Sequence, residues 1–283
     1  MSAASQPAAP LGGRRNILPY AALTAAYCTH AGFFNPFLPL WLKGLGLSLA
    51  VISVLTSIQA ATRMIAPYAW GTLSDRTGER AKLLRWGALA ALFASAGLWF
   101  PGGGAWWLAL VLLLMFIQTS GMMPMTEAAV AQVVSQGGVF DTKLYGRVRL
   151  WGSLGFMLAV LGAGALFERV GLGSFPLIVT LSLVVLVVFA YRLPDVKEAH
   201  HTSSVRESVP IGPVLAQPVV RWFFASAFFH VFSHMGIYTF FSLYMDSLGY
   251  SKTMIGLLWA VSVTVEIGWF FTCLLYTSPS PRD

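Results

Sequence analysis

An acidic residue and a basic residue lie on either side of one short polar turn in a largely apolar part of the chain. Glu127 precedes the turn at 135–143 and Arg149 follows it, and the point midway between them falls inside the turn. If the flanking segments are neighbouring helices, the carboxylate and the guanidinium lie at one depth and can form a charge-assisted hydrogen bond. In a membrane, either charge without a partner would cost several kcal/mol.

This pair has two interpretations. It can simply hold two helices together, because structural ion pairs are common. Alternatively, it forms a polar binding site in an aqueous cavity. The second interpretation is favoured, since replacing such a pair by apolar residues is often neutral or stabilising, and its presence therefore suggests another use.

The composition places these residues in an all-α polytopic membrane protein. Of the 283 residues 57% are hydrophobic and 10% are charged, against roughly 25% charged in a soluble domain. Eight apolar runs are each long enough to cross about 30 Å of hydrocarbon. We expect helices at 17–42, 50–73, 83–100, 105–134, 149–167, 174–191, 221–245 and 251–272.

The net charge of +7 follows the membrane topology. Lys and Arg gather at the amino terminus and in every second loop, whereas the opposite loops hold only Lys43, Arg169 and Lys252. By the positive-inside rule the amino terminus is cytoplasmic. The basic residues therefore indicate orientation in a bilayer, and we expect no nucleic-acid partner.

An internal repeat relates the start of the chain to its end. A shift of 203 residues aligns 37–55 with 240–258, and seven positions are identical: Phe37, Leu40, Leu45, Gly46, Ser48, Ile52 and Leu55. The seventh and eighth helices thus look like a second copy of the first two, as in transporters built from two six-helix halves. The same shift places Arg63, too deep in its helix to reach the surface easily, at the position of Glu266.

The segment 71–80 reads GTLSDRTGER, in which glycines permit a tight turn and charges favour the cytoplasmic side. Gly71, Asp75, Arg76, Gly78 and Arg80 fit the pattern G-x-x-x-D-[RK]-x-G-x-[RK]. A generic charged turn is the simpler explanation. The pattern nevertheless resembles the signature between helices 2 and 3 of the major facilitator superfamily, where the resemblance implies a loop that takes part in conformational gating.

Within that superfamily the chain resembles the branch of 3-phenylpropionic acid transporters and, more distantly, the lactose permeases. The resemblance rests on the segment above and on PFLPLWLKGLGLS, MPMTEAAVAQ and YGRVRLWGSLGF. By position it implies that Glu127 and Arg149 bind the substrate. Ser153 and Phe156 stand where lactose permeases have a cysteine and a sugar-stacking tryptophan, which disfavours a galactoside substrate.

The resemblance implies a major facilitator fold in a bacterial-type inner membrane, truncated to about eight of twelve transmembrane helices. A cytoplasmic tail (1–15) precedes a complete N-terminal six-helix bundle (16–191), a cytoplasmic linker (192–220) and the first two helices of the second bundle (221–272). Residues 273–283 resemble a translated sequencing adaptor, and we expect them to be an artefact. A monomer without cofactors is expected.

The implied function is proton-coupled symport of a small organic solute, with an aromatic carboxylate such as phenylpropionate favoured. Arg149 would bind the substrate carboxylate, Phe156 would supply an apolar wall and Arg63 would also contact substrate. Glu127 or Glu266 would take the proton. A sugar or nucleoside proton symporter of the same superfamily is the alternative.

Functions of other classes remain open as well. His230 and His234 lie one helical turn apart and could begin the metal site of a histidine-box membrane enzyme. No acidic residue nearby completes such a site, so we expect neither a metal nor an enzyme. A membrane sensor or an inert fragment would have the same helices but would carry no solute flux.

Overall fold

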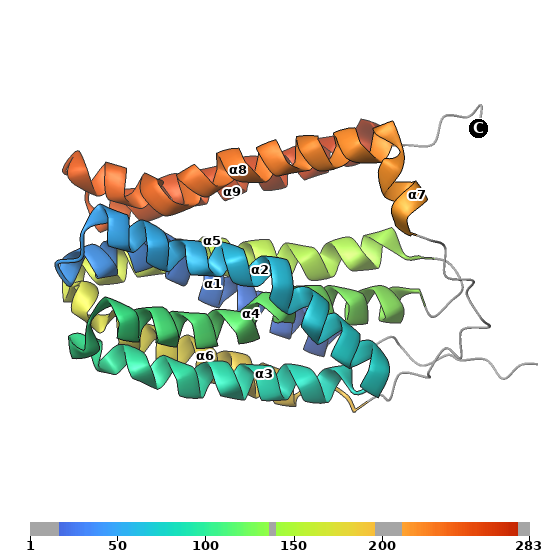
Figure 1. Ribbon diagram of the computed structural model, residues 1–283, viewed down its shortest axis with the longest axis horizontal. Coiled ribbons are helices and arrows are strands. Elements are labelled where there is room, and N and C mark those ends of the chain that lie inside the picture. Colours follow the sequence, from blue (N-terminus) through green and yellow to red (C-terminus); the bar gives the residue numbers. More distant parts are fainter. Residues whose placement is uncertain (1–16, 136–139, 196–210, 277–283) are drawn as a thin grey trace, which may run out of the picture.

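The computed structural model describes residues 17–135, 140–195 and 211–276, and most of them belong to long helices that run side by side (Figure 1). The bounds are α1 Leu18–Gly44, α2 Leu49–Thr77, α3 Arg80–Ser95, α4 Gly104–Val134, α5 Thr142–Val170, α6 Phe175–Tyr191, the short α7 Ile211–Ala216, α8 Pro218–Ser247 and α9 Lys252–Tyr276. Short 3₁₀ turns lie between α3 and α4 and before α6.

Five of the described segments are long and apolar enough to cross a membrane. They correspond to α2, α3 with the following 3₁₀ turn, α4, α5 and α6. All the eight predicted helices are present, and the chain is a helical multi-pass membrane protein, as the sequence predicts.

Three boundaries in the structure differ from those expected from the sequence. The fifth helix was expected from residue 149, but α5 begins at Thr142 because the Asp141 carboxylate caps the Leu144 backbone N–H at 3.0 Å. The predicted linker 192–220 includes helical residues in α7 and at the start of α8. The last helix continues to Tyr276, past the expected limit at 272, while 277–283 lie outside the described residues.

An aromatic core surrounds α1, which continues unbroken through two buried prolines, 36 and 39. Trp41 stacks on Phe175 of α6 with ring centroids 5.1 Å apart, and Phe34 lies against both Phe116 of α4 and Phe175. The buried His30 adds a polar link, because its Nδ1 lies 2.8 Å from the Ser182 hydroxyl of α6. These contacts place α1 at the centre of the first six helices.

Glycines bring the backbones of α1 and α5 into close contact. A Cβ atom at Gly155 would lie 2.6 Å from the Ala25 carbonyl oxygen, and one at Gly32 would lie 2.6 Å from the Phe156 carbonyl oxygen. Such small residues are how membrane helices approach closely. The contact fixes the face of α5 that carries Arg149 relative to α1.

The internal repeat predicted from the sequence is visible in the backbone. The turn after α1 and the turn after α8 both contain a left-handed glycine, Gly46 with φ 81° and Gly249 with φ 83°. Ser48 and Ser251 then begin α2 and α9 in the same way, because each hydroxyl accepts a hydrogen bond from the backbone N–H three residues later. The two helix pairs therefore share their connecting turn as well as their sequence pattern.

The α8–α9 pair lies along one side of the other helices and meets them near these turns (Figure 1). Towards the opposite end the two groups diverge in the view of Figure 1. Along α8 the residues from Pro218 to Phe240 include no buried side chain, whereas Ser242 and Leu243 close to the turn are buried. Within the described residues α8 is thus buried only near this turn.

Candidate functional site

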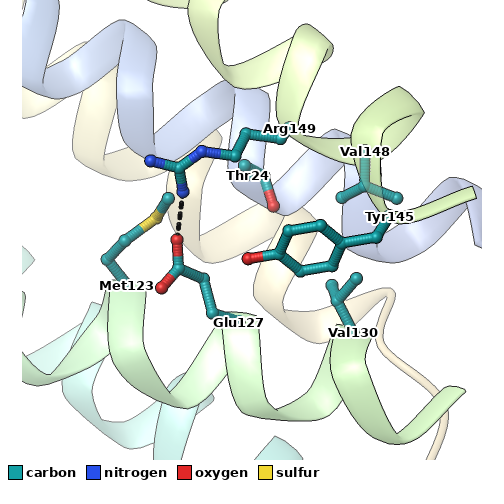
Figure 2. Close-up of a pocket in the computed structure, with 7 residues that line it drawn as sticks. All are labelled: Thr24, Met123, Glu127, Val130, Tyr145, Val148 and Arg149. Atoms are coloured by element: carbon teal, nitrogen blue, oxygen red, sulfur yellow. Dashed lines mark hydrogen bonds and ion pairs between the residues drawn. The ribbon is translucent and has the colours of Figure 1, made fainter. Parts of the chain in front are cut away.

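The predicted ion pair forms and lies on a cleft between α1, α4 and α5. An Arg149 guanidinium nitrogen donates a hydrogen bond to Oε1 of Glu127. The cleft is small in this conformation, with a cavity volume of about 10 Å³, and Figure 2 shows the pair among its lining residues: Thr24, Met123, Glu127, Val130, Tyr145, Val148 and Arg149. The sequence prediction that the two charges face each other across the 135–143 turn is therefore confirmed by the geometry.

The local sequence explains how each charge reaches the cleft. Glu127 follows Thr126 on α4. The Thr126 hydroxyl donates a hydrogen bond to the Met122 carbonyl oxygen, so this neighbouring polar group is bonded within its own helix. Arg149 lies on α5 one residue after the buried Val148, which packs with Val130 of α4. The apolar contact between Val148 and Val130 holds the two helices together beside the charges.

Both charged side chains remain accessible. The side chain of Arg149 is 52% exposed and that of Glu127 is 39% exposed. Both groups are therefore accessible in this conformation. The guanidinium has five N–H donors, of which the contact with Glu127 uses one.

The sequence did not predict the five other lining residues, which are Thr24, Met123, Val130, Tyr145 and Val148. Met123 and Tyr145 each precede a charged partner by four residues, so one helical turn of spacing from Glu127 and Arg149 could have found them. Figure 2 shows the Met123 thioether beside the ion pair and the Tyr145 ring directed into the same space. Thr24 belongs to α1, and no sequence signal connects it with the pair.

Phe156 was predicted as an apolar wall of this site, but it is not among the residues that line the cleft. It lies about two turns beyond Arg149 on α5, half-buried against the hydrophobic core. Its backbone carbonyl is the atom that approaches Gly32. In this conformation Phe156 therefore contributes to packing between α5 and α1.

Arg63 and Glu266, which the repeat makes equivalent, are both exposed and make no ion pair with each other within the described residues. Neighbouring Thr62 bonds Ser120 on α4, about two turns from Glu127, so Arg63 lies outside the cleft. Its helix packs chiefly on α4, whereas the helix of Glu266 packs on α5.

The contacts of α9 with α5 give Glu266 an approximate depth. Gly256 lies against Val160, and the Thr264 hydroxyl lies 3.5 Å from the Met157 sulfur. If this antiparallel packing continues, Glu266 lies within roughly one helical turn of the level of Arg149. Of the two charged residues in the cleft, Arg149 is the one that lies on α5, the helix against which α9 with Glu266 packs.

The gating motif was predicted as a loop, and this is wrong for most of its length. Helix α2 continues to Thr77, so Gly71, Asp75 and Arg76 are helical, and Gly78 alone provides the left-handed turn with φ 65°. Arg80 begins α3 and reaches back to α2, where its Nε donates to the Ser74 hydroxyl at 3.0 Å and another nitrogen lies 3.5 Å from Asp75. The motif is a tight, cross-bonded corner between two helices.

The two histidines of α8 do not form a metal centre in the described part of the chain, where no group of three His, Cys, Asp or Glu side chains is close enough to bind a metal ion. His234 Nδ1 lies 3.0 Å from the His230 carbonyl oxygen, and both rings are exposed. His200 and His201 lie outside the described residues.

Comparison with known proteins gives consistent matches. Residues 23–276 match a family model described as "MFS_1 like family". The chain is 28% identical over 240 residues to the "Probable 3-phenylpropionic acid transporter" of Escherichia coli (strain K12), a match that covers 83% of this chain and 61% of that protein. It is 31% identical over 215 residues to the "Maltose permease" of Geobacillus stearothermophilus, covering 75% of this chain and 52% of that protein. The chain thus spans between half and two thirds of the length of these curated relatives.

Proposed function

The chain belongs to the MFS_1 like family of the major facilitator superfamily, and from this premise we propose that it is part of a secondary transporter that moves a small organic solute by alternating access. Its orientation follows the basic residues, with the amino terminus in the cytoplasm of a bacterial-type cell and the protein in the inner membrane. The 135–143 turn and the cleft beside it then face the cytoplasmic half of the membrane.

The substrate we favour is a small carboxylate with an apolar, preferably aromatic, body. The observation that carries this choice is the accessible Arg149 guanidinium in a cleft whose other lining residues, apart from Glu127 and Thr24, are apolar or aromatic: Met123, Val130, Tyr145 and Val148. A guanidinium binds a carboxylate through two parallel hydrogen bonds, and apolar walls accept the rest of the molecule. A relative that is named for 3-phenylpropionic acid supports the same class.

Proton coupling follows from competition for Arg149. When a substrate carboxylate binds the guanidinium, Glu127 loses its partner while it remains in a partly desolvated cleft. Proton uptake would then accompany substrate binding, and the return of Arg149 to Glu127 would release the proton. Glu266, near the level of Arg149, is a second proton acceptor that the packing of α9 on α5 allows.

A sugar is the second candidate substrate class, since another relative is named for maltose. Glu127 and the Tyr145 hydroxyl offer hydrogen bonds to hydroxyl groups, and an aromatic ring can stack on a sugar. The two classes differ in what Arg149 does. A carboxylate needs its positive charge, whereas a neutral sugar does not.

The test is binding and uptake of labelled 3-phenylpropionate and maltose by the chain in proteoliposomes, with and without an inward proton gradient. We expect 3-phenylpropionate to bind, to accumulate only with the gradient, and to lose binding in R149Q. In E127Q we expect exchange down a gradient to persist while accumulation is lost.

The opposite results are equally informative. Accumulation of maltose but not of 3-phenylpropionate would overturn the carboxylate assignment. Binding of either solute without any flux would favour a sensor over a transporter. Unchanged accumulation in E127Q would move the coupling role to another acid, for which E266Q is the matched variant.

A further inference from the structure

One carboxylate holds together the end of the molecule where the two helix pairs meet. Asp246, at the end of α8, accepts hydrogen bonds from Lys43 Nζ at Oδ2 (2.8 Å) and from Lys252 Nζ at Oδ1 (2.9 Å). Both carboxylate oxygens are therefore used, one by each lysine. Lys43 comes from the end of α1 and Lys252 from the start of α9.

The same end also contains a close contact between α5 and α9. The Lys252 backbone N–H donates to Glu168 Oε2 of α5 at 2.6 Å. A Cβ atom at Gly164 would lie 2.6 Å from the Lys252 carbonyl oxygen, and one at Gly256 would lie 2.6 Å from the Val160 carbonyl oxygen. Helices α1, α5, α8 and α9 are thus tied together around Asp246.

The opposite end has no comparable closure among the described residues. There α8 is exposed along its length, and the cleft with Glu127 and Arg149 lies towards that end. The described part of the molecule is therefore shut beside the turns that carry Lys43 and Asp246 and divergent at the other end. In a protein that works by alternating access, the shut end has to open in another state.

We propose that Lys43 and Asp246 form a gate that closes the extracytoplasmic end of the transport path, and that this ion pair breaks when that end opens. The proposal rests on the transport function proposed above. A partly exposed ion pair suits this role, because such pairs are weak enough to break and re-form readily. The Lys43 side chain is 44% exposed and that of Asp246 is 20% exposed.

The two lysines have different parts in the gate. Lys252 follows Asp246 by one short turn and belongs to the same helix pair, so it moves together with Asp246. Lys43 belongs to the first helix pair and is the partner that moves away. Lys252 then compensates the carboxylate in the open state, so that opening leaves no isolated negative charge.

Spin labels beside the pair test this gate without any need for transport. Gly44 and Ser247 are exposed, and a Cβ atom at Gly44 would meet no atom within 4 Å, so G44C and S247C accept labels with little disturbance. With C28S and C273S in the background, pulsed electron resonance on the chain in lipid nanodiscs reports the distance distribution between the labels.

We expect K43Q and D246N to increase the long-distance population about twofold to fivefold, as the loss of one partly exposed ion pair predicts. K252Q is the matched control, and it should not increase the long-distance population, because the open state then loses the charge that compensates Asp246. K43R should also leave it unchanged, which shows that the charge and not the lysine as such is required.

An unchanged distribution in both K43Q and D246N would overturn the gate. An equal shift in K252Q would overturn the assignment of the moving contact to Lys43. A different result would contradict the proposed transport function alone: no variant would show solute flux, while the label distances would still respond to K43Q.

Discussion

Lys43 and Asp246 are bonded to each other and are also equivalent positions of the internal repeat, since they lie 203 residues apart and their side chains meet at 2.8 Å. Two equivalent residues meet when they lie close to the axis that relates the copies. Identical charges would repel at such a position. The divergence of one copy to lysine and of the other to aspartate turns a point of repulsion into a bond between the halves.

The gate should resist moderate acid. Asp246 lies outside the membrane span expected at 221–245. Burial raises the pKa of its carboxyl group, but hydrogen bonds from Lys43 and Lys252 outweigh this effect and lower the pKa below the ordinary 3.8. Stabilisation by a group with a lowered pKa is complete above the ordinary value and is lost as the pH falls through the lowered one. Glu168 and Arg169 of α5 are the further charged groups at this end among the described residues. We expect the label distances to stay short down to about pH 5 and to lengthen only below 3.8; lengthening between pH 6 and pH 5 would contradict this.

Tyr145 should contribute to substrate selectivity. Removal of its ring in Y145A takes one aromatic wall from the cleft, so the affinity for 3-phenylpropionate should fall by roughly threefold to tenfold, with little change for an aliphatic carboxylate of similar length. Isothermal titration with both ligands measures the ratio. L150A is the control, because Leu150 lies on the same helix but does not line the cleft. Equal losses for both ligands in Y145A would indicate a general loss of structure.

Gly155 should not tolerate a side chain. In G155A the new Cβ would lie 2.6 Å from the Ala25 carbonyl oxygen, and α1 and α5 would have to move apart. We expect a loss of about 1–3 kcal/mol of stability, seen as a lower Tm in detergent. G162A is the matched control on the same helix, since a Cβ atom at Gly162 would meet no atom within 4 Å, and better helix propensity should leave it neutral or slightly stabilised. Similar Tm values for both variants would show that the close contact is not needed.

Arg85 should be needed for the end of α6. It donates to the carbonyl oxygens of Ala190 (3.3 Å) and Leu193 (2.6 Å) and also pairs with Asp195 at 2.6 Å. The Ala190 carbonyl oxygen also accepts the Leu193 backbone N–H at 3.3 Å, so Arg85 reinforces the turn that ends α6, and R85A should cost about 1–3 kcal/mol. The exposed Lys82, which pairs only with Glu79 of its own segment, provides the control. K82A should change the Tm by much less, as is usual for surface ion pairs.

The sequence was most informative where charge or repetition restricted the structure. The Glu127–Arg149 contact was predictable because the two residues are equidistant from one polar turn, and the repeat predicted the paired turns at Gly46 and Gly249. The contact of Lys43 with Asp246 was not predicted, although the repeat aligned them, because equivalence in sequence does not say whether two copies touch. Periodicity also could not show that Phe156 faces the core, since apolar residues surround α5 on several sides.

The same repeat led to a weaker inference at Arg63 and Glu266. Both positions are equivalent in sequence, but in this conformation α2 packs on α4 and α9 packs on α5, so the pair is not brought together. Equivalent depth is readable from an alignment. Lateral position is decided by packing between helices, which depends on many small contacts.

The glycine contact between α5 and α9 has a kinetic consequence. At Gly164 and Gly256 the two helices meet through backbone atoms, without side chains that interlock. Interlocked side chains must change rotamer before helices can move past each other, whereas two smooth backbone surfaces can slide. The glycines therefore keep the barrier to opening low. The stability of the closed contact at this end then depends on the few polar bonds around Asp246. A side chain at either glycine would lie 2.6 Å from a backbone carbonyl oxygen, so such mutations would loosen the closed contact as well as change how fast the end opens, whereas mutations at the ion pair would change chiefly how often it is open.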